Sequence, residues 1–476
     1  MDLKGRLQMI AERNTEREYI YKQIYQQIKN QILSGIYKPQ EKLPSKRQLA
    51  ERLDVSTNSV VVALDQLLTE GYIYSVERKG YFVEDITHYV ADDKEAKPLP
   101  KHLKETRKSS SNIISFSHMS ANMDLFPYKE WLKCEQKALK TFHHDLSFMS
   151  HNQGPFEVRQ TLAQYISFNR GVRCEPEQII FHSSSQALVS QLLELCGDNK
   201  SIALENPGYA RYYELIQQKG WKIHTVPIDD SGFQIEAIQD KDIELLYTTP
   251  SHQFPTGIIM PISRRFELLN WASAKKGRYI IEDDYDSEFK YGTNNIPSLQ
   301  SLDRNNRTIY TGTFSKTLFP GIRISYMVLP PELLEIYRKK FDYLLPQCNT
   351  LSLYTLLYFI KNGYYQKHIR KMTHHFETIR QKLIKELKRT FKNDINILDV
   401  PAGLHFLVKI KTTRDYEEIA ARAEKVQIHF FNIKRFSLIE RVEPENENSF
   451  IIGFASLKEE EIKEAVQRLF KTIKGS

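Results

Sequence analysis

Apolar positions in the first 85 residues follow a helical period and then give way to two short strands. Ile20, Ile24, Ile28 and Ile32 recur at every fourth position, which predicts an amphipathic helix over residues 19–34. Further along, the pattern predicts a helix over 45–53, a helix that begins at Ser56 and ends at Gly71, and a hairpin with strands over 72–76 and 81–83. This order of elements is that of a winged helix-turn-helix.

From Ile113 onward, short apolar strands alternate with helical stretches. Strands are expected over 179–181, 201–204, 244–247, 279–281 and 308–310. Such alternation predicts an α/β domain with a mostly parallel sheet. After residue 351 the chain becomes rich in helix, with strands expected near 404–408 and 450–454, which predicts a small C-terminal α+β lobe.

The segment between these two patterns is polar, charged and proline-containing, and it is therefore expected to be a linker. The predicted division is a first domain over 1–85, a linker over 86–112 and an α/β domain over 113–476, with a large part over about 113–345 and a small lobe over about 346–476. A chain of 476 residues fits this division, since domains average roughly 150 residues.

Composition narrows the class of protein but does not identify it. Apolar residues make up 41% and charged residues 26%, which is ordinary for a globular chain and excludes a disordered or fibrous one. The four cysteines show no Cys-x-x-Cys spacing, so neither a disulfide framework nor a metal site is expected. No signal peptide or membrane span is expected either, and the reducing cytoplasm is the expected location.

The beginning of the third predicted helix carries the candidate DNA contacts. In a helix-turn-helix, this end of the helix enters the major groove, where short polar side chains reach phosphates and base edges. The alternative is that Ser56 only caps the helix and that the basic residues form a solvated face. The candidate DNA-binding residues are Arg47 of the second helix, Ser56, Thr57, Asn58 and Ser59 of the third, and Arg78 and Lys79 at the tip of the hairpin.

Three motifs in this region closely resemble the DNA-binding domain of the GntR family of regulators. They are Leu-Pro-Ser-Lys-Arg-Gln-Leu-Ala over 43–50, Leu-Asp-Val-Ser over 53–56 and Leu-Leu-Thr-Glu-Gly over 67–71. The resemblance implies binding to a double-stranded DNA operator. Thr57 stands where the family often has arginine, and the hairpin reads Arg-Lys-Gly rather than Gly-x-Gly, so the operator sequence does not carry over.

The most specific chemistry in the α/β domain is that of a pyridoxal 5′-phosphate site. Such a site needs a lysine for a Schiff base, a carboxylate for the ring nitrogen, a phenol for the ring oxygen and an anion-binding loop for the phosphate. Singly the candidates are weak, but their order and spacing together are specific. They are Lys316 for the Schiff base, Asp283 for the nitrogen, Tyr285 for the ring oxygen, and Ser184, Ser185, Ser315 and Arg323 for the phosphate.

These residues resemble the cofactor site of the fold type I aminotransferases, which implies that fold for the domain. Pro-Ser-His-Gln-Phe-Pro-Thr-Gly over 250–257 matches the Asn-Pro-x-Gly loop of that family, with Phe254 in place of the asparagine. Contacts to the ring oxygen are therefore expected from Tyr285 and from Gln253. Ser183 replaces a glycine that usually precedes the phosphate-binding helix.

A GntR-type head joined to an aminotransferase-type body resembles the MocR subfamily of bacterial regulators, and in particular its γ-aminobutyrate-responsive members. The resemblance implies a head-to-tail, domain-swapped homodimer, with RNA polymerase as a further candidate partner. Ile451 stands where aminotransferases place the arginine that holds an α-carboxylate. The resemblance implies four effector-binding residues instead, namely Arg211, Arg435, Tyr209 and His118.

The expected function is that of a regulator in which an amino-acid effector, with γ-aminobutyrate as the first candidate, forms an external aldimine with the cofactor on Lys316 and changes operator engagement. Three alternatives stay open. The body could be a working aminotransferase, with transamination at most partial or slow. The protein could sense pyridoxal phosphate itself and control vitamin B6 synthesis. The body could be purely structural, which the presence of Lys316 disfavours.

Overall fold

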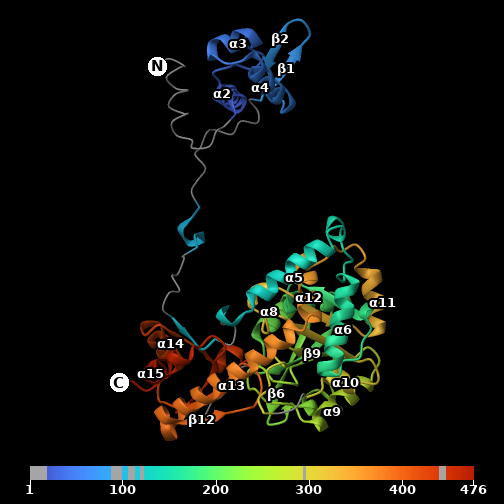
Figure 1. Cartoon of the computed structure of the whole chain (residues 1–476), viewed down its shortest axis with the longest axis vertical. Coiled ribbons are helices and arrows are strands. Elements are labelled where there is room, and N and C mark those ends of the chain that lie inside the picture. Colours follow the sequence, from blue (N-terminus) through green and yellow to red (C-terminus); the bar gives the residue numbers. More distant parts are fainter. Residues whose placement is uncertain are drawn as a thin grey trace. The chain divides into compact units, whose positions relative to one another are not determined.

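The computed structural model describes residues 19–86, 99–105, 113–117, 123–292, 296–438 and 446–475. The chain divides into two compact units, residues 1–109 and 110–476, and each is described by itself (Figure 1). Within the described ranges, no helix is both long and apolar enough to cross a membrane. Residue His118 lies outside the described residues.

Over residues 19–86, the N-terminal unit contains three helices and a hairpin, in the order that the sequence predicts. Two side-chain caps fix the helix starts: Ser45 forms a capping box with Gln48, and the Ser56 hydroxyl accepts a hydrogen bond from the Ser59 backbone N–H at 3.2 Å. The elements are α2 (Ile20–Leu33), α3 (Lys46–Leu53), α4 (Thr57–Thr69), β1 (Ile73–Val76) and β2 (Gly80–Val83). A short 3-10 turn, Lys101–Leu103, lies later in this unit.

The core of this unit forms between α2 and α4. Ile24, Ile28 and Ile32 of α2 are buried and pack with the apolar face of α4, on which Val60 and Leu64 are fully buried. The predicted stripe on α2 is wrong at its first member, because Ile20 is 54% exposed. It is the first residue of the helix.

The large part of the C-terminal unit is built on an eight-stranded sheet with the strand order β4-β11-β10-β9-β8-β5-β6-β7. Strands β10, β9, β8, β5 and β6 are parallel, whereas β11 pairs antiparallel with both β10 and β4. The strands are β4 (Ile179–His182), β5 (Ser201–Asn206), β6 (Lys222–Asp229), β7 (Gly232–Phe233), β8 (Leu245–Thr248), β9 (Tyr279–Asp284), β10 (Thr308–Thr313) and β11 (Ser325–Val328).

Helices cover both faces of this sheet, so its central strands are buried throughout (Figure 1). On β9, Ile280 packs in a cluster with Leu268 of α9, while Ile281 packs in another cluster with Leu188 of α7. Alternate residues of a strand point to opposite faces, and this decides which β9 side chains reach the site. The helices are α5 (Tyr128–Thr141), α6 (Phe156–Arg170), α7 (Ser185–Cys196), α8 (Ala210–Gln218), α9 (Ile262–Ser273), α10 (Leu299–Leu302), α11 (Pro331–Lys340), α12 (Thr350–Lys361) and α13 (Tyr364–Phe391).

The end of the chain forms a small α+β lobe, as the sequence predicts. Its antiparallel sheet has the order β12-β13-β16-β15 and packs against α13, α14 and α15. A separate short pair joins β3 (Ile114–Ser115) to β14 (Ile428–His429). The remaining elements are β12 (Ile395–Leu398), β13 (His405–Lys411), α14 (Tyr416–Lys425), β15 (Phe431–Asn432), the 3-10 turn η8 (Ile433–Phe436), β16 (Glu447–Gly453) and α15 (Ile462–Ile473).

Candidate functional site

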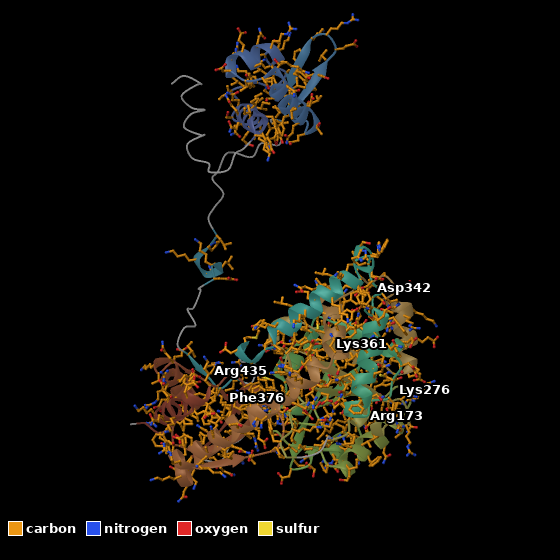
Figure 2. All side chains as sticks on the ribbon, viewed as in Figure 1. Arg173, Lys276, Asp342, Lys361, Phe376 and Arg435 are labelled. Atoms are coloured by element: carbon orange, nitrogen blue, oxygen red, sulfur yellow. The ribbon has the colours of Figure 1, made fainter. Side chains whose placement is uncertain are left out.

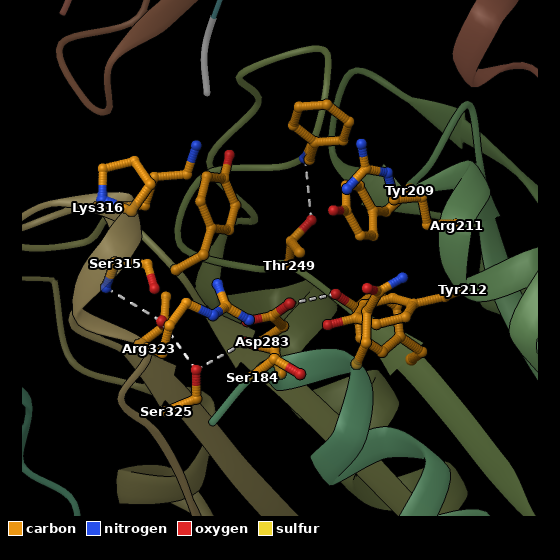
Figure 3. A pocket seen from close by; sticks show the side chains of 17 residues that line it. Ser184, Tyr209, Arg211, Tyr212, Thr249, Asp283, Ser315, Lys316, Arg323 and Ser325 are labelled. Carbon is orange, nitrogen blue, oxygen red and sulfur yellow. Dashed lines mark hydrogen bonds between the residues drawn. The ribbon is translucent and has the colours of Figure 1, made fainter. Parts of the chain in front are cut away.

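A cavity opens where the carboxyl ends of the parallel strands meet, which is the usual position of a ligand site in an open α/β sheet (Figure 3). Its volume is about 220 Å³. All seven cofactor residues expected from the sequence line it, together with two of the expected effector residues: Lys316, Asp283, Tyr285, Ser184, Ser185, Ser315, Arg323, Tyr209 and Arg211.

Asp283 supplies a buried carboxyl on the floor of the cavity. It lies at the end of β9, on the face that Ile281 shares with α7, whereas Asp284 turns to the other face and pairs with Arg170 at 2.7 Å. The hydroxyl of Tyr247 donates a hydrogen bond to Asp283. Burial raises the pKa of Asp283 to about 7, and no ion pair to it occurs among the described residues. A protonated ring nitrogen would supply the cation that keeps this carboxylate charged.

Lys316 follows the end of β10 and lines the same cavity as Asp283. Burial lowers the pKa of Lys316 to about 8, although the carboxylates of Asp286 and Asp283 oppose the shift. At pH 7 about one tenth of an amine with this pKa is the neutral nucleophile, far more than of a lysine with the ordinary pKa of 10.5. The residue therefore has the reactivity that a Schiff-base lysine needs.

The pKa of Lys316 predicts how cofactor loading depends on pH. Below pH 8 the buried amine becomes an ammonium ion, so the loading rate of cofactor-free protein is expected to fall about tenfold for each pH unit and to level off above pH 8. Absorbance stopped-flow at several pH values measures this rate. A lysine side chain with the ordinary pKa of 10.5, as in N-acetyl-lysine, is the control and should show no plateau before pH 10. A protein rate that also rises steadily to pH 10 would contradict the assignment.

At the expected phosphate end of the site, hydroxyl groups, the first turn of α7 and an arginine come together. Ser184 is the N-cap of α7, and its hydroxyl accepts from the Ala187 N–H at 3.2 Å. The Ser185 hydroxyl donates to Ser325 at 3.4 Å. In Figure 3, Ser315, Lys316 and Arg323 lie together on one side of the cavity. Backbone N–H groups at a helix start, hydroxyls and a guanidinium together form an anion site.

Tyr285 is the only tyrosine among the expected cofactor-binding residues, and its hydroxyl contacts His252. Its hydroxyl donates to the His252 backbone carbonyl at 3.0 Å and lies 3.0 Å from His252 Nδ1. Phe254 lines the cavity at the position of the missing asparagine. The expectation for Gln253 is wrong. It does not line the cavity, because its amide N–H group is bonded to Glu205 Oε2 and the Pro207 carbonyl at 3.1 and 3.0 Å.

The expected effector residues are only partly brought together. Tyr209 caps the start of α8, and Arg211 follows in its first turn, so both line the cavity opposite Lys316 (Figure 3). Arg435 does not line it: this residue is exposed on η8, with its guanidinium over the Phe431 ring at 4.7 Å (Figure 2). It immediately precedes Phe436, whose ring packs against Phe254 of the cavity wall at 5.0 Å. His118 cannot be placed, since it lies outside the described residues.

Ile451 is fully buried in the small lobe, where it packs with Phe254, Phe431 and Phe436. An apolar cluster therefore occupies the position from which aminotransferases extend an arginine to an α-carboxylate. Next to Ile451, the small lobe therefore presents apolar side chains and not a cation that could bind a carboxylate.

Several lining residues were not found by sequence reasoning. Tyr247, which bonds Asp283, lies on β8, and Thr313, which accepts from Ser325 at 2.9 Å, ends β10. Thr249 follows β8, and Tyr212 lies on α8. The two threonines and Ser325 could have been found from the sequence, because each is a hydroxyl residue at or next to the end of an apolar strand. The two tyrosines could not, because in the sequence they look like ordinary core residues.

The candidate DNA contacts lie on the surface of the N-terminal unit. All but Ser59, which is half-buried, are exposed: Arg47, Ser56, Thr57, Asn58, Arg78 and Lys79. Ser56 is the N-cap of α4, and the open end of that helix is therefore polar. Arg78 takes a left-handed conformation, φ 61°, at the tip of the hairpin. The capping role of Ser56 does not conflict with a phosphate contact, because both use the same helix end.

Comparison with known proteins identifies both units. Residues 20–83 match the family of bacterial regulatory proteins, gntR family, and residues 115–469 match aminotransferase class I and II. The uncharacterized HTH-type transcriptional regulator YdeL of Bacillus subtilis is 36% identical over 450 residues, which cover 94% of this chain and 96% of that protein. The probable rhizopine catabolism regulatory protein MocR of Rhizobium meliloti is 26% identical and covers 94% of this chain and 93% of its own.

A third relative is the pyridoxine biosynthesis transcriptional regulator PdxR of Corynebacterium glutamicum, 30% identical over 389 residues, with 81% of this chain and 82% of that protein covered. Among solved structures, the α-aminoadipate aminotransferase LysN of Thermus thermophilus, complexed with N-(5′-phosphopyridoxyl)-L-leucine, aligns with a TM-score of 0.67 at 25% identity. It covers 78% of this chain and 95% of its own.

The fold, the cofactor set and these matches agree along nearly the whole chain. The amine, the buried carboxyl and the anion site of the C-terminal unit fit pyridoxal 5′-phosphate. The N-terminal unit is a GntR-type DNA-binding domain. The chain therefore belongs to the MocR-type helix-turn-helix transcriptional regulators of the GntR family, with a pyridoxal-phosphate-dependent aminotransferase-like domain.

Proposed function

We propose that this regulator reads a small amino acid, with γ-aminobutyrate as the first candidate, and changes its engagement with operator DNA in response. One observation carries the proposal: a single cavity combines the cofactor set around Lys316 with Arg211, while Ile451 is buried where an α-carboxylate clamp would stand. A ligand whose carboxylate lies farther from its amine suits this arrangement better than an ordinary α-amino acid.

When bound, pyridoxal phosphate would supply an electrophilic carbonyl carbon for which the amine of Lys316 and that of an effector would compete, so that the effector binds only as the lysine amine is released. The residues of the chain do the rest. Asp283 keeps a positive charge at the ring nitrogen, and the start of α7 with Arg323 holds the phosphate. Arg211 attracts the effector carboxylate, and Tyr209 packs beside it. Ligand binding shifts the regulator between two states only by its difference in affinity for them, typically 1–3 kcal/mol.

Replacing Arg211 with alanine should weaken γ-aminobutyrate binding by roughly ten- to hundredfold, which is the usual cost of losing hydrogen bonds to a charged group. Titration of the cofactor absorbance with γ-aminobutyrate measures the change. Lys219→Ala is the matched control, because it removes an exposed cation at the other end of α8. Arg435→Ala tests the second proposed clamp in the same way. Unchanged binding in Arg211→Ala would remove this residue from the effector site.

Two other functions are supported by specific observations. The relative named as a regulator of pyridoxine biosynthesis favours a sensor of the cofactor itself. The complete cofactor set, with a lysine of lowered pKa, favours an active aminotransferase with a regulatory head. The same cofactor-binding residues disfavour a purely structural role for the C-terminal unit.

Measurement of DNA binding separates these functions. A binding duplex is first selected from a random pool with the cofactor-loaded full chain, and its affinity and footprint are then compared for cofactor-free, loaded and γ-aminobutyrate-treated protein. A change that requires γ-aminobutyrate supports the proposal. A change produced by the cofactor alone, with none on adding amines, contradicts it and supports cofactor sensing.

The remaining partners are proposals as well. We expect a head-to-tail, domain-swapped homodimer that acts on DNA in the cytoplasm and contacts RNA polymerase there. The mass of the particle in solution, and its change when the N-terminal unit is deleted, would test the dimer.

A further inference from the structure

A buried pair of side chains, His252 and Asp286, lies directly behind Tyr285. Both are 2% exposed, and the His252 Nδ1 atom lies 3.0 and 3.2 Å from the two Asp286 carboxylate oxygens. The same Nδ1 atom lies 3.0 Å from the Tyr285 hydroxyl oxygen. One imidazole nitrogen therefore faces both a carboxylate and the phenol of the cofactor site.

The chemistry of the partners decides where the hydrogens lie. A carboxylate only accepts hydrogen bonds, so His252 Nδ1 carries a hydrogen and shares it between Asp286 and the Tyr285 oxygen. The Tyr285 hydroxyl in turn donates to the His252 backbone carbonyl at 3.0 Å. His252 thus holds the Tyr285 hydroxyl by two hydrogen bonds: its Nδ1–H donates to the hydroxyl, and its backbone carbonyl accepts from it. Asp286 fixes the imidazole tautomer that carries the hydrogen on Nδ1.

The surrounding backbone leaves space for this imidazole and for little else. A Cβ atom on Gly403 would lie 2.0 Å from His252 Cε1, and one on Gly257 would lie 3.3 Å from His252 Nε2. Gly403 also has a φ of +72°, which disfavours any other residue. The ring of His405 packs against the His252 ring at 4.8 Å. These contacts hold the imidazole in one orientation.

His252, Asp286 and His405 are also close enough to hold a cation, since their ligand atoms lie within 4.8 Å of one another. Hydrogen bonds explain the short distances between His252, Asp286 and Tyr285 without a bound cation. The His252 Nδ1 atom already lies at hydrogen-bond distance from Asp286 and is shared with Tyr285, so an ion at this atom would have to displace both contacts.

We propose that His252, held by Asp286, is a positioning residue that orients the Tyr285 hydroxyl toward the cofactor ring oxygen and so sets the ionisation state of that oxygen. The need arises because Phe254 replaces the asparagine that would otherwise contact the same oxygen, which leaves the ring oxygen without that second polar contact from the cavity wall. The inference rests on the proposed placement of Tyr285 at the cofactor. Asp286 also acts on Lys316 electrostatically, which places the pair beside the reactive amine.

The visible spectrum of the cofactor-loaded protein tests this inference, because its bands report the ionisation of the ring oxygen and need no turnover. We expect Tyr285→Phe to change the ratio of the two bands roughly fivefold, the effect of one ordinary hydrogen bond, and His252→Leu to reproduce that change. His252→Asn should restore the spectrum, since its amide N–H group can replace Nδ1–H. Cofactor stoichiometry and circular dichroism are measured for every variant.

Gly403→Ala provides a second route if His252→Leu does not fold, because the added methyl group overlaps the positions of the His252 imidazole and of Asp286 Oδ2 and leaves both residues in the chain. It should shift the bands in the same direction as Tyr285→Phe. A wild-type spectrum in His252→Leu or Gly403→Ala, together with a changed one in Tyr285→Phe, would overturn the role of His252 and leave the proposed function intact. A wild-type spectrum in Tyr285→Phe would overturn both this inference and the proposed cofactor contact.

Discussion

Replacing Lys316 with alanine should abolish the response of the regulator to its effector while leaving the N-terminal unit able to bind DNA. Lys316 is the cavity-lining amine that we propose holds the cofactor covalently, and the DNA-binding unit has its own core around α2 and α4. The visible band of the lysine-bound cofactor should disappear completely. Absorbance and DNA binding of the same preparation, with and without γ-aminobutyrate, measure both effects.

Lys290 offers a matched control for this experiment. It is a second buried lysine, and burial also lowers its pKa to about 7, but it does not line the cavity. Lys290→Met should therefore keep the visible band and the effector response. Loss of the band in Lys290→Met but not in Lys316→Ala would contradict the assignment of the reactive lysine.

Replacing Asp283 with asparagine should weaken cofactor binding by at least about thirtyfold. The change preserves the shape of the side chain and its contact with Tyr247, but it removes the charge that we propose pairs with the ring nitrogen. Removing one partner of a buried charge pair costs about 2–5 kcal/mol. Equilibrium dialysis of the cofactor measures the affinity. Asp242→Asn, an exposed aspartate paired with Lys275, is the control and should bind normally. Wild-type affinity in Asp283→Asn would show that the carboxylate does not meet the ring nitrogen.

The parts of the site that could be predicted are those whose chemistry is unusual for their position in the chain. An acid at the end of an apolar strand, as at Asp283, and a lysine in a loop after a strand, as at Lys316, are costly to bury without a partner. Because the ends of parallel strands meet at one edge of a sheet, the strand pattern also predicts that these residues come together. The capped start of α4 at Ser56 was predictable for a similar local reason.

The parts that could not be predicted depend on neighbours that are distant in sequence. Tyr247 meets Asp283 only because β8 and β9 pair in parallel, and no local pattern distinguishes it from a core tyrosine. Strand β11 lies antiparallel between β10 and β4, an arrangement that the alternation of elements does not indicate. Gln253 was assigned wrongly because its partner, Glu205, lies on β5, and the buried carboxylate there draws the amide away from the cavity.

Titration of the visible absorption of the cofactor-loaded full chain with amino acids would show whether an amino acid is sensed at Lys316. γ-Aminobutyrate, β-alanine, glutamate, alanine and a D-amino acid are added separately, and keto product is assayed in the same samples. We expect γ-aminobutyrate alone to remove the lysine-bound band, without sustained keto product. No spectral change with any of the amines would contradict the claim that an amino acid is sensed at Lys316, and sustained keto product would show an enzyme rather than a sensor.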